Sequence, residues 1–435
     1  MKRPSVILLL TAVFTNSGVA ENWAQWRGPF FNGSTTETNL PTEWSKTENV
    51  RWVTPLPGYS GATPVIWDDS VFVSSPDSQK SLLLLCIGRQ DGKFRWQRTV
   101  SDGDQEKGRN NMASPSPVTD GRTVFLLVGT GKLAAFDFSG KPLWSRDLAK
   151  DYGKFSINWL YGSSPLLYRN KLYIEVLQAN PVPGGYPQAV DDKPQRESFL
   201  LCLDPATGQN LWRQIRASDA VSEAQEAYTT PIPCENGNHS KIIVVGGNYV
   251  TAHDSATGAE LWRCAGLNDR HEMFWRIVPS PVIAGRMIIA CGPKRDPVLG
   301  IQDGGHGLVT DTHLAWKFKE YTADCVTPLF YKDKLFVLDG DRQMMTCLDP
   351  KTGQKKWQGN LGVHDIFRAS PTGADGKIYC LSEAGTVVVL SAGDEFKILS
   401  TISMGESPVR ASIAAAHGEL FIRTARNLYC VDGGR

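Results

Sequence analysis

The chain has 435 residues, of which 41% are hydrophobic and 21% charged, so it can bury a large core. Its 46 basic and 45 acidic residues nearly cancel, and no basic face stands out, which argues against a nucleic-acid partner. With 41 Gly and 26 Pro, the sequence favours many turns over long helices.

Residues 1–20 have the pattern of a signal peptide. Lys2 and Arg3 form a basic start, and residues 6–14 are a short, mostly apolar run. Small residues at 18–20 suit a signal peptidase. The apolar run is shorter than the roughly 20 residues of a membrane-spanning helix. We therefore expect cleavage after Ala20, export to the periplasm or the outside, and no transmembrane segment.

A nine-residue corner occurs twice in nearly the same form, as DPATGQNLW at 204–212 and DPKTGQKKW at 349–357. In the first copy the Asp204 carboxylate can accept backbone N–H bonds that start a turn, and Pro205 fixes an early φ. Gly208 can adopt the positive φ that closes a tight loop. The corner therefore predicts two strands joined by a turn, with a Trp on the outgoing strand.

Incomplete copies of this corner recur along the chain. They alternate with a second signature, in which a Ser or Thr is followed by Pro and then by a run of residues that favour β-strands. The second signature begins at Thr63, Ser116, Ser164, Thr230, Ser280, Thr327 and Ser370. The Trp residues of the corners are Trp96, Trp144, Trp212, Trp262, Trp316 and Trp357. Units of about 40–50 residues with four strands each are typical of propeller blades. The recurrent Trp side chains are accordingly interpreted as packing residues.

The two ends of the chain complete one blade between them. Residues 411–432 supply three strands, and the missing outermost strand is found at 49–53, which carries Trp52. This predicts an all-β, eight-bladed propeller over residues 49–435, with four antiparallel strands per blade and the ring closed by the N-terminal strand. Closure leaves no open ring edge to aggregate. Residues 21–48 are predicted to form an N-terminal extension.

Five of the nine cysteines occupy matching strand positions, at 86, 202, 347, 380 and 430. A small apolar side chain at a repeated strand position explains this pattern, and an odd cysteine count argues against a complete disulfide framework. We expect these five thiols to be free and buried.

Two long excursions interrupt the repeat, at 178–197 in the third blade and 291–305 in the fifth. Both are predicted between the second and third strands. The fifth blade also lacks the Asp-x-x-Thr-Gly corner. Loops of this length are commonly functional, so either excursion could act as a lid or a docking arm.

The connections that lead from one blade to the next meet at one mouth of a propeller. Polar and aromatic residues gather in these connections, where aromatic rings provide stacking area and Arg provides forked donors. Trp275, Arg276 and Arg368 are the preferred candidates, although all of these residues could simply solvate the mouth. The complete candidate ligand or partner site is Arg109, Asn111, Trp159, Tyr161, Glu226, Tyr228, Trp275, Arg276, Asp324, Arg368 and Arg410.

Common catalytic and metal motifs are missing from the sequence. The 7 His never recur at His-x-x-x-His spacing, and His271-Glu272 lacks the second His of a zinc motif. There is no Gly-x-Ser-x-Gly elbow and no Gly-Lys-Ser/Thr phosphate loop. No catalytic residue, metal ligand or cofactor is predicted from these patterns.

The corner motif resembles the repeats of the pyrroloquinoline-quinone (PQQ) propellers. That group includes quinoprotein alcohol dehydrogenases and the propeller lipoprotein of the outer-membrane assembly machinery. WAQWRGP at 23–29, with NG at 32–33, is similar to the opening of an exported, planctomycete-type subgroup, and residues 304–316 resemble a second segment of it.

For the quinoprotein enzymes, the resemblance implies PQQ held between a Trp and a vicinal Cys-Cys pair, with Ca²⁺ bound by Glu, Asn and Asp. Adjacent cysteines do not occur in this sequence, and neither does a Cys-x-x-Cys-His haem motif. We therefore expect an exported, monomeric module that binds a small ligand or a protein at the mouth. The alternative is a PQQ- and Ca²⁺-dependent dehydrogenase of alcohols or sugars.

Overall fold

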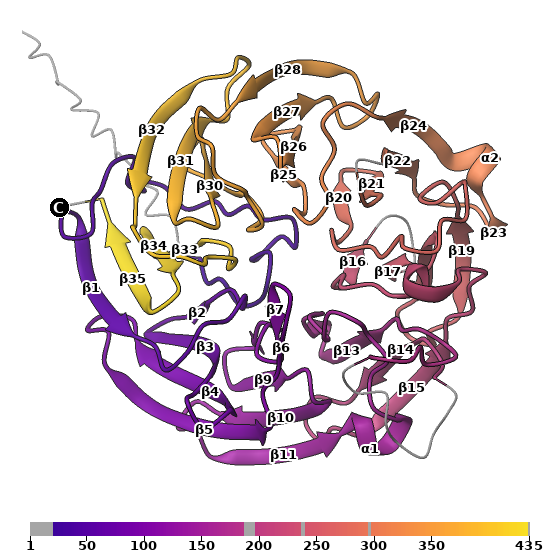
Figure 1. Cartoon of the computed structure of the whole chain (residues 1–435), viewed down its shortest axis with the longest axis horizontal. Coiled ribbons are helices and arrows are strands. Elements are labelled where there is room, and N and C mark those ends of the chain that lie inside the picture. The colour runs from indigo at the N-terminus through magenta and orange to yellow at the C-terminus, as the bar shows by residue number, and fades with distance from the viewer. Residues whose placement is uncertain (1–20, 187–195, 236–239, 295–296, 434–435) are drawn as a thin grey trace, which may run out of the picture.

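The computed structural model describes residues 21–186, 196–235, 240–294 and 297–433, and shows a ring of eight β-sheets (Figure 1). The predicted signal peptide lies outside the described residues. The predicted propeller class is confirmed, since each blade is built on four antiparallel strands, which follow chain order from the ring centre outward in the first seven blades. Within the described ranges, no helix is both long and apolar enough to cross a bilayer.

Blades one to four have the following strands: β2 (Val65–Trp67), β3 (Ser70–Pro76), β4 (Ser81–Gly88) and β5 (Phe94–Asp102); β8 (Val118–Thr119), β9 (Thr123–Leu127), β10 (Lys132–Asp137) and β11 (Pro142–Asp147); β12 (Leu166–Tyr168), β13 (Lys171–Val176), β14 (Phe199–Leu203) and β15 (Asn210–Ile215); β16 (Ile232–Cys234), β17 (Lys241–Gly246), β18 (Tyr249–Asp254) and β19 (Glu260–Cys264).

Blades five to eight have the following strands: β20 (Val282–Ala284), β21 (Met287–Cys291), β22 (Val298–Gln302) and β24 (Leu314–Phe318); β25 (Leu329–Tyr331), β26 (Lys334–Asp339), β27 (Met344–Leu348) and β28 (Lys355–Asn360); β29 (Thr372–Ala374), β30 (Lys377–Leu381), β31 (Thr386–Ser391) and β32 (Ile398–Ser403); β33 (Ala414–Ala416), β34 (Glu419–Arg423), β35 (Asn427–Asp432) and β1 (Val50–Pro55). The remaining elements are the hairpin β6 (Glu106–Lys107) and β7 (Asn110–Asn111), β23 (Gly307–Leu308), and the short helices α1 (Leu148–Tyr152) and α2 (Thr310–His313).

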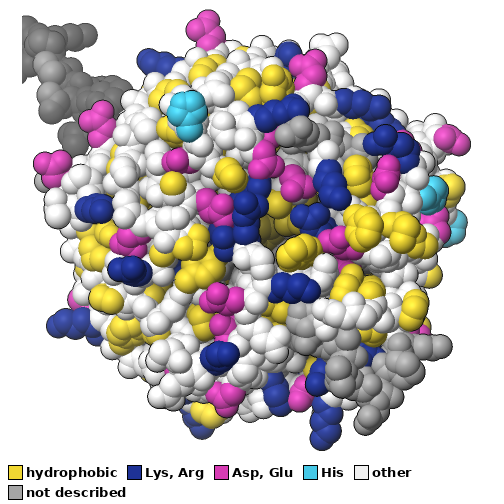
Figure 2. Space-filling model, viewed as in Figure 1, with side chains coloured by type: hydrophobic (Ala, Val, Ile, Leu, Met, Phe, Trp, Pro, Cys, Tyr) yellow, Lys and Arg dark blue, Asp and Glu magenta, His cyan; other side chains and the backbone are white. Residues whose placement is uncertain are grey.

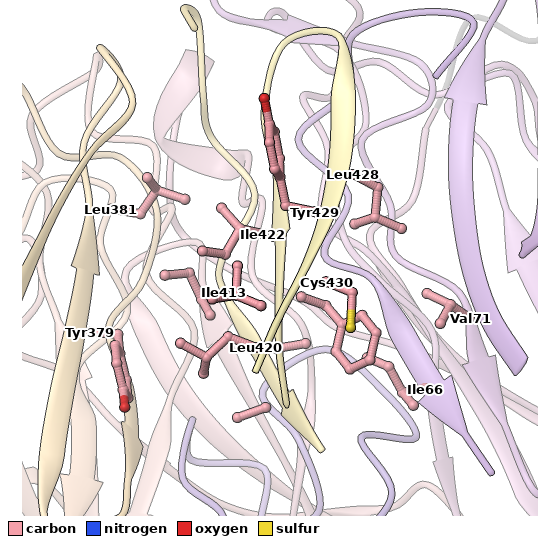
Figure 3. Close-up of a cluster of buried hydrophobic side chains, with 14 of the residues drawn as sticks. Ile66, Val71, Tyr379, Leu381, Ile413, Leu420, Ile422, Leu428, Tyr429 and Cys430 are labelled. Atoms are coloured by element: carbon pink, nitrogen blue, oxygen red, sulfur yellow. The ribbon is translucent and has the colours of Figure 1, made fainter. Parts of the chain in front are cut away.

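The N-terminal strand closes the ring, as predicted. β1 pairs antiparallel with β35, and Trp52 lies opposite Cys430. Blade eight is therefore built from both ends of the chain and packs between blades seven and one. Figure 3 shows this interior, where Tyr379 of β30 and Leu420 of β34 belong to the same buried cluster as Val71 of β3. Burial of this apolar surface joins the ends of the chain.

A circle of hydrogen bonds links all eight innermost strands at their starts. The backbone N–H of one Ser or Thr donates to the hydroxyl of the equivalent residue in the next blade, at 2.8–3.2 Å. The last bond runs from the Ser412 N–H to the Thr63 hydroxyl and completes the circle. We call these residues the collar: Thr63, Ser116, Ser164, Thr230, Ser280, Thr327, Ser370 and Ser412.

The repeated corner docks each blade onto its neighbour. The Asp204 carboxylate accepts the Ala206 N–H, and its carbonyl accepts the N–H of Gly208, which has φ +71°. Trp144 of the preceding blade packs against this corner and donates its indole N–H to the Pro205 carbonyl at 2.8 Å. The same pairing of Trp and Gly recurs as Trp52–Gly92, Trp96–Gly140, Trp212–Gly258 and Trp316–Gly353. This interblade contact explains why the sequence repeats.

The fifth blade departs from the pattern, and the predicted position of its excursion is wrong. Part of the 291–305 segment is β22, the third strand, so the long connection instead runs from 303 to 313, before the fourth strand. Within it, β23 adds a fifth strand to blade four by pairing in parallel with β19, with Gly307 opposite Trp262. Elsewhere the corner of one blade packs on the Trp of the preceding blade. Blade five has no such corner, and residues of this connection lie beside Trp262 instead.

The five strand cysteines lie in the core, as expected. Cys86, Cys202, Cys347, Cys380 and Cys430 are all buried, and all nine cysteines are unbridged in the structure. Burial raises the pKa of the Cys202 thiol to about 12, so it remains an uncharged packing group at neutral pH.

The docking role of the corner predicts that Gly208→Ala costs more free energy of unfolding than Gly285→Ala. Both glycines have positive φ, at +71° and +64°, but a Cβ at 208 would lie 2.7 Å from the Trp144 ring whereas one at 285 meets no atom of the described residues within 4 Å. We expect a loss of about 1 kcal/mol for Gly285→Ala and about 2–4 kcal/mol for Gly208→Ala in urea unfolding. Equal losses would contradict the docking role.

Candidate functional site

A cup of about 580 Å³ opens on the face where the blade-to-blade connections meet. Figure 2 shows this face hollowed near the ring centre, with basic side chains around a hydrophobic interior. The cup is lined by Trp26, Gly61, Gly108, Arg109, Asn110, Ser114, Ser116, Trp159, Gly162, Ser164, Tyr228, Thr230, Arg276, Val278, Asp324, Cys325, Thr327, Arg368, Ser370, Arg410 and Ser412.

The N-terminal segment crosses the ring and supplies Trp26 to the floor of the cup. Its residue Trp23 forms a β-bridge with Ile66, and Ser34 forms one with Gly373, so the segment spans from blade one to blade seven. Both bridges are to innermost strands, β2 and β29, at residues that follow the collar positions in the chain. Trp26 lies between the two bridging residues in sequence and lines the cup. The central channel is therefore a cup with an aromatic floor.

Arg27 fixes this floor to the ring. Its buried guanidinium donates to the carbonyls of Pro328 and Pro371, each at 2.9 Å, and to the Asn32 carbonyl at 2.8 Å. Both prolines directly follow collar residues. Burial lowers the Arg27 pKa to about 9, which leaves the group charged at neutral pH. The three carbonyls thus accept from Nη1 and Nη2 of this buried cation, whereas its buried Nε has no hydrogen-bond partner among the described residues.

Seven of the eleven predicted site residues line the cup. They are Arg109, Trp159, Tyr228, Arg276, Asp324, Arg368 and Arg410. They come from seven different blade-to-blade connections, so the ring brings together residues that are up to 301 positions apart, as in the hydrogen bond from Arg410 to the Arg109 carbonyl.

The other four predicted residues do not line the cup. Asn111 is buried and donates to the Tyr59 carbonyl at 2.7 Å. Tyr161 is buried and donates to the Glu175 carbonyl at 2.8 Å. Glu226 is buried beneath the rim, and the Trp275 indole donates to the Leu267 carbonyl at 2.9 Å. These four side chains lie outside the lining of the cup and bond to backbone or rim groups instead.

Sequence reasoning missed the floor and the collar hydroxyls. In the sequence Trp26 stands out only as part of the WAQWRGP motif, and Ser116, Ser164 and Ser370 stand out only as markers of strand starts, yet all of them line the cup. The signal for the hydroxyls was present, since a Ser or Thr precedes every innermost strand. Cys325, half-buried in the wall, carried no signal of its own.

Four arginines line the wall of the cup, Arg109, Arg276, Arg368 and Arg410, and each of them pairs with a carboxylate. Arg276 lies 3.5 Å from Glu223, and Arg368 lies 2.5 Å from Asp341. Arg410 and Arg109 share Glu383, at 2.6 and 3.6 Å. None of these three carboxylates is among the residues that line the cup. The four arginines therefore line the cup while their acidic partners lie outside its lining.

Asp324 is the single carboxylate among the lining residues. Its two oxygens already accept from the Lys294 N–H at 2.8 Å and from the Cys325 thiol at 3.5 Å. Burial raises the Cys325 pKa to about 12, so the thiol keeps its proton at neutral pH and can donate it to this carboxylate.

Glu226 anchors part of the rim. Its carboxylate accepts the Asn158 N–H at 2.9 Å and the Tyr228 hydroxyl at 3.2 Å, and it also accepts the hydroxyl of Tyr186. Tyr186 belongs to the 178–197 excursion, whose residues 187–195 lie outside the described part. Burial raises the Glu226 pKa to about 7. The described start of this excursion is thus fastened to the rim of the cup.

The sequence matches the family model described as outer membrane protein assembly factor BamB over residues 33–175 and 248–397. The match covers more than half of the chain, which therefore belongs to this family of PQQ-repeat propellers. No curated protein sequence matches the chain.

Solved structures share the fold at low sequence identity. BamB from Moraxella catarrhalis is 14% identical with a TM-score of 0.61, covering 88% of this chain and 99% of that one. Quinohemoprotein alcohol dehydrogenase from Comamonas testosteroni is 12% identical with a TM-score of 0.68, covering 97% and 82%. A europium-containing methanol dehydrogenase is 10% identical with a TM-score of 0.68, covering 94% and 90%. At these identities the likeness shows the fold alone.

Glu226 should make stability depend on pH. Its folded-state pKa of about 7 lies above the ordinary Glu value of about 4.3, so the folded state holds the proton more tightly than the unfolded state. The stabilisation from this group is complete below about pH 4 and is lost as the pH rises towards 7. Glu226→Gln should flatten the fall in Tm between pH 5 and pH 7.5. Glu48→Gln, at an exposed residue, is the control. An identical fall in Tm for the wild type, Glu226→Gln and Glu48→Gln would refute the assignment.

Proposed function

We propose that this protein is an exported module that binds a ligand or a protein partner at the cup. The observation that carries the proposal is the cup itself, a cavity of about 580 Å³ with an aromatic floor and four arginines on its wall. Concave sites with apolar surface and a few oriented polar groups are typical of ligand binding. The closed ring holds these groups in place, so little ordering is needed on binding.

The residues of the cup fit the quinoprotein cofactors poorly. The resemblance implies a vicinal cysteine pair, but Cys325 is the single cysteine among the lining residues. It also implies a Glu, Asn and Asp set for Ca²⁺, whereas Asp324 is the single lining carboxylate and already accepts two hydrogen bonds. Over the described part of the chain, no three His, Cys, Asp or Glu residues are grouped to hold a metal ion. A binding role is therefore favoured over PQQ- and Ca²⁺-dependent catalysis.

The dehydrogenase alternative has two observations in its favour. The fold matches an alcohol dehydrogenase with a TM-score of 0.68, and Trp26 lies at the floor, where a planar cofactor could stack. Under that alternative PQQ with Ca²⁺ would occupy the cup and supply the oxidation of an alcohol or a sugar.

A protein partner would use the rim rather than the interior. Met273 and Phe274 are 52% and 60% exposed on the connection that also carries Arg276. Apolar side chains of this size at the edge of a polar cavity are common at protein contacts. The proposed periplasmic or extracellular location rests on residues 1–20 and on the family description as an outer membrane assembly factor.

Native mass spectrometry of protein purified from its own host tests the binding role. We expect a small molecule or a protein to remain bound to the wild type and to be lost from Trp26→Ala, which removes the floor. Phe30→Ala is the matched control, since Phe30 belongs to the same segment but is 47% exposed and does not line the cup.

Dye-reduction assays with added PQQ and Ca²⁺ test the alternative in parallel. The binding proposal expects no activity with alcohols or aldoses. Robust dye reduction that depends on PQQ would overturn the proposal and establish the dehydrogenase.

A further inference from the structure

We propose that the cup recognises an oxyanion, a carboxylate or phosphate group, which the collar hydroxyls and wall arginines bind as hydrogen-bond donors. The inference rests on the proposed function that the cup holds a ligand, and it adds the chemical class of that ligand.

The collar hydroxyls provide the first argument. Six of them line the cup: Ser116, Ser164, Thr230, Thr327, Ser370 and Ser412. Each oxygen accepts a backbone N–H from the preceding blade. A hydroxyl has one proton to donate as well, and no hydrogen bond donated by any of these six is observed among the described residues. Because a hydroxyl that already accepts a bond is polarised as a donor, the collar offers donors to whatever fills the cup.

Arg368 provides an independent argument. Its side chain is only 10% exposed, and the nitrogen that binds Asp341 at 2.5 Å is Nη2. The other two guanidinium nitrogens, Nε and Nη1, are buried and have no hydrogen-bond partner among the described residues. Buried donors without an acceptor are rare because they cost free energy. Arg368 lines the cup and lies two residues before the collar residue Ser370, which also lines it, so both bring donors to the same cavity.

The balance of donors and acceptors selects the ligand. Four arginines and six collar hydroxyls supply donors to the cup, whereas Asp324 is the single lining carboxylate and its oxygens already accept two hydrogen bonds. A neutral sugar needs acceptors for its own hydroxyl protons, and the wall offers few. An ionised carboxylate carries acceptors only, and a phosphate group carries mainly acceptors, so both match this surface.

The charges around the cup set the expected strength and salt dependence. Glu223, Asp341 and Glu383 balance most of the arginine charge from positions outside the lining. Recognition therefore depends on directed hydrogen bonds more than on a net positive field. Binding should persist in physiological salt, where long-range attraction between exposed charges is screened.

Calorimetric titrations with citrate, inorganic phosphate and glucose at constant ionic strength test the inference on the wild-type protein. We expect citrate or phosphate to bind with a Kd below about 1 mM, and glucose to give no binding heat. The comparison of citrate with phosphate shows which oxyanion the cup prefers.

Substitutions locate the binding. Arg368→Gln and Arg276→Gln should each weaken oxyanion binding by about tenfold, which corresponds to the loss of one charge-assisted hydrogen bond. The matched control is Arg122→Gln, which removes the same charge from an exposed turn of blade two that does not line the cup. Binding by the control should stay within about twofold of the wild type.

Hydrogen–deuterium exchange of the wild type gives an answer even if a variant fails to fold. Citrate or phosphate should protect the collar segments 114–118, 162–166, 325–329 and 368–372. The inference is overturned if neither oxyanion binds, if protection falls outside the cup, or if Arg122→Gln weakens binding as much as Arg368→Gln. Glucose binding without oxyanion binding would overturn the oxyanion class while leaving the proposed function intact. Loss of all ligand and partner binding at the cup would overturn both.

Discussion

The molecule depends on the collar, the closed circle of eight hydrogen bonds at the starts of the innermost strands. Each of these backbone N–H groups belongs to a buried residue, and an unpaired buried amide is costly. A Ser or Thr side chain is short enough to supply the acceptor to the adjacent blade. In seven blades the following Pro keeps the backbone extended at this point. The eight bonds of 2.8–3.2 Å therefore fix the spacing and orientation of all the innermost strands.

The floor and wall of the cup follow from this circle. Arg27 reaches the carbonyls of Pro328 and Pro371, the residues directly after two collar positions, so the floor is attached to the collar itself. The local sequence accommodates this arrangement, because a Cβ at Gly33 would lie 2.0 Å from the Arg27 guanidinium. The wall arginines lie a few residues before the collar on the other side. One set of hydrogen bonds therefore organises both the stability of the ring and the geometry of the proposed binding site.

The sequence was informative wherever the structure repeats. The repeat length, the corner residues and the N-terminal strand that carries Trp52 predicted eight blades and ring closure. They could do so because every blade packs against its neighbour through the same kinds of side chain. Prediction was weaker where a single local choice decides the outcome. Asn111 and Trp275 lie in the predicted connections but turn towards backbone carbonyls, and side-chain direction in an irregular loop leaves no periodic signal. Trp26 was missed because the path of its segment across the ring is set by distant contacts, such as the bridge between Ser34 and Gly373. The fifth-blade excursion was misplaced because β22 ends without the Asp-x-x-Thr-Gly corner that marks the third strands of blades three, four and six.

A crystal structure of the protein grown with saturating citrate or phosphate tests the central claim most directly, since the claim concerns which atoms of the ring are left to bind a ligand. The account predicts an oxyanion in the cup, with its oxygens within hydrogen-bond distance of collar hydroxyls and of Arg368 or Arg276. An intact collar surrounding a cup that holds only water, with the oxyanion bound elsewhere or not at all, would contradict it.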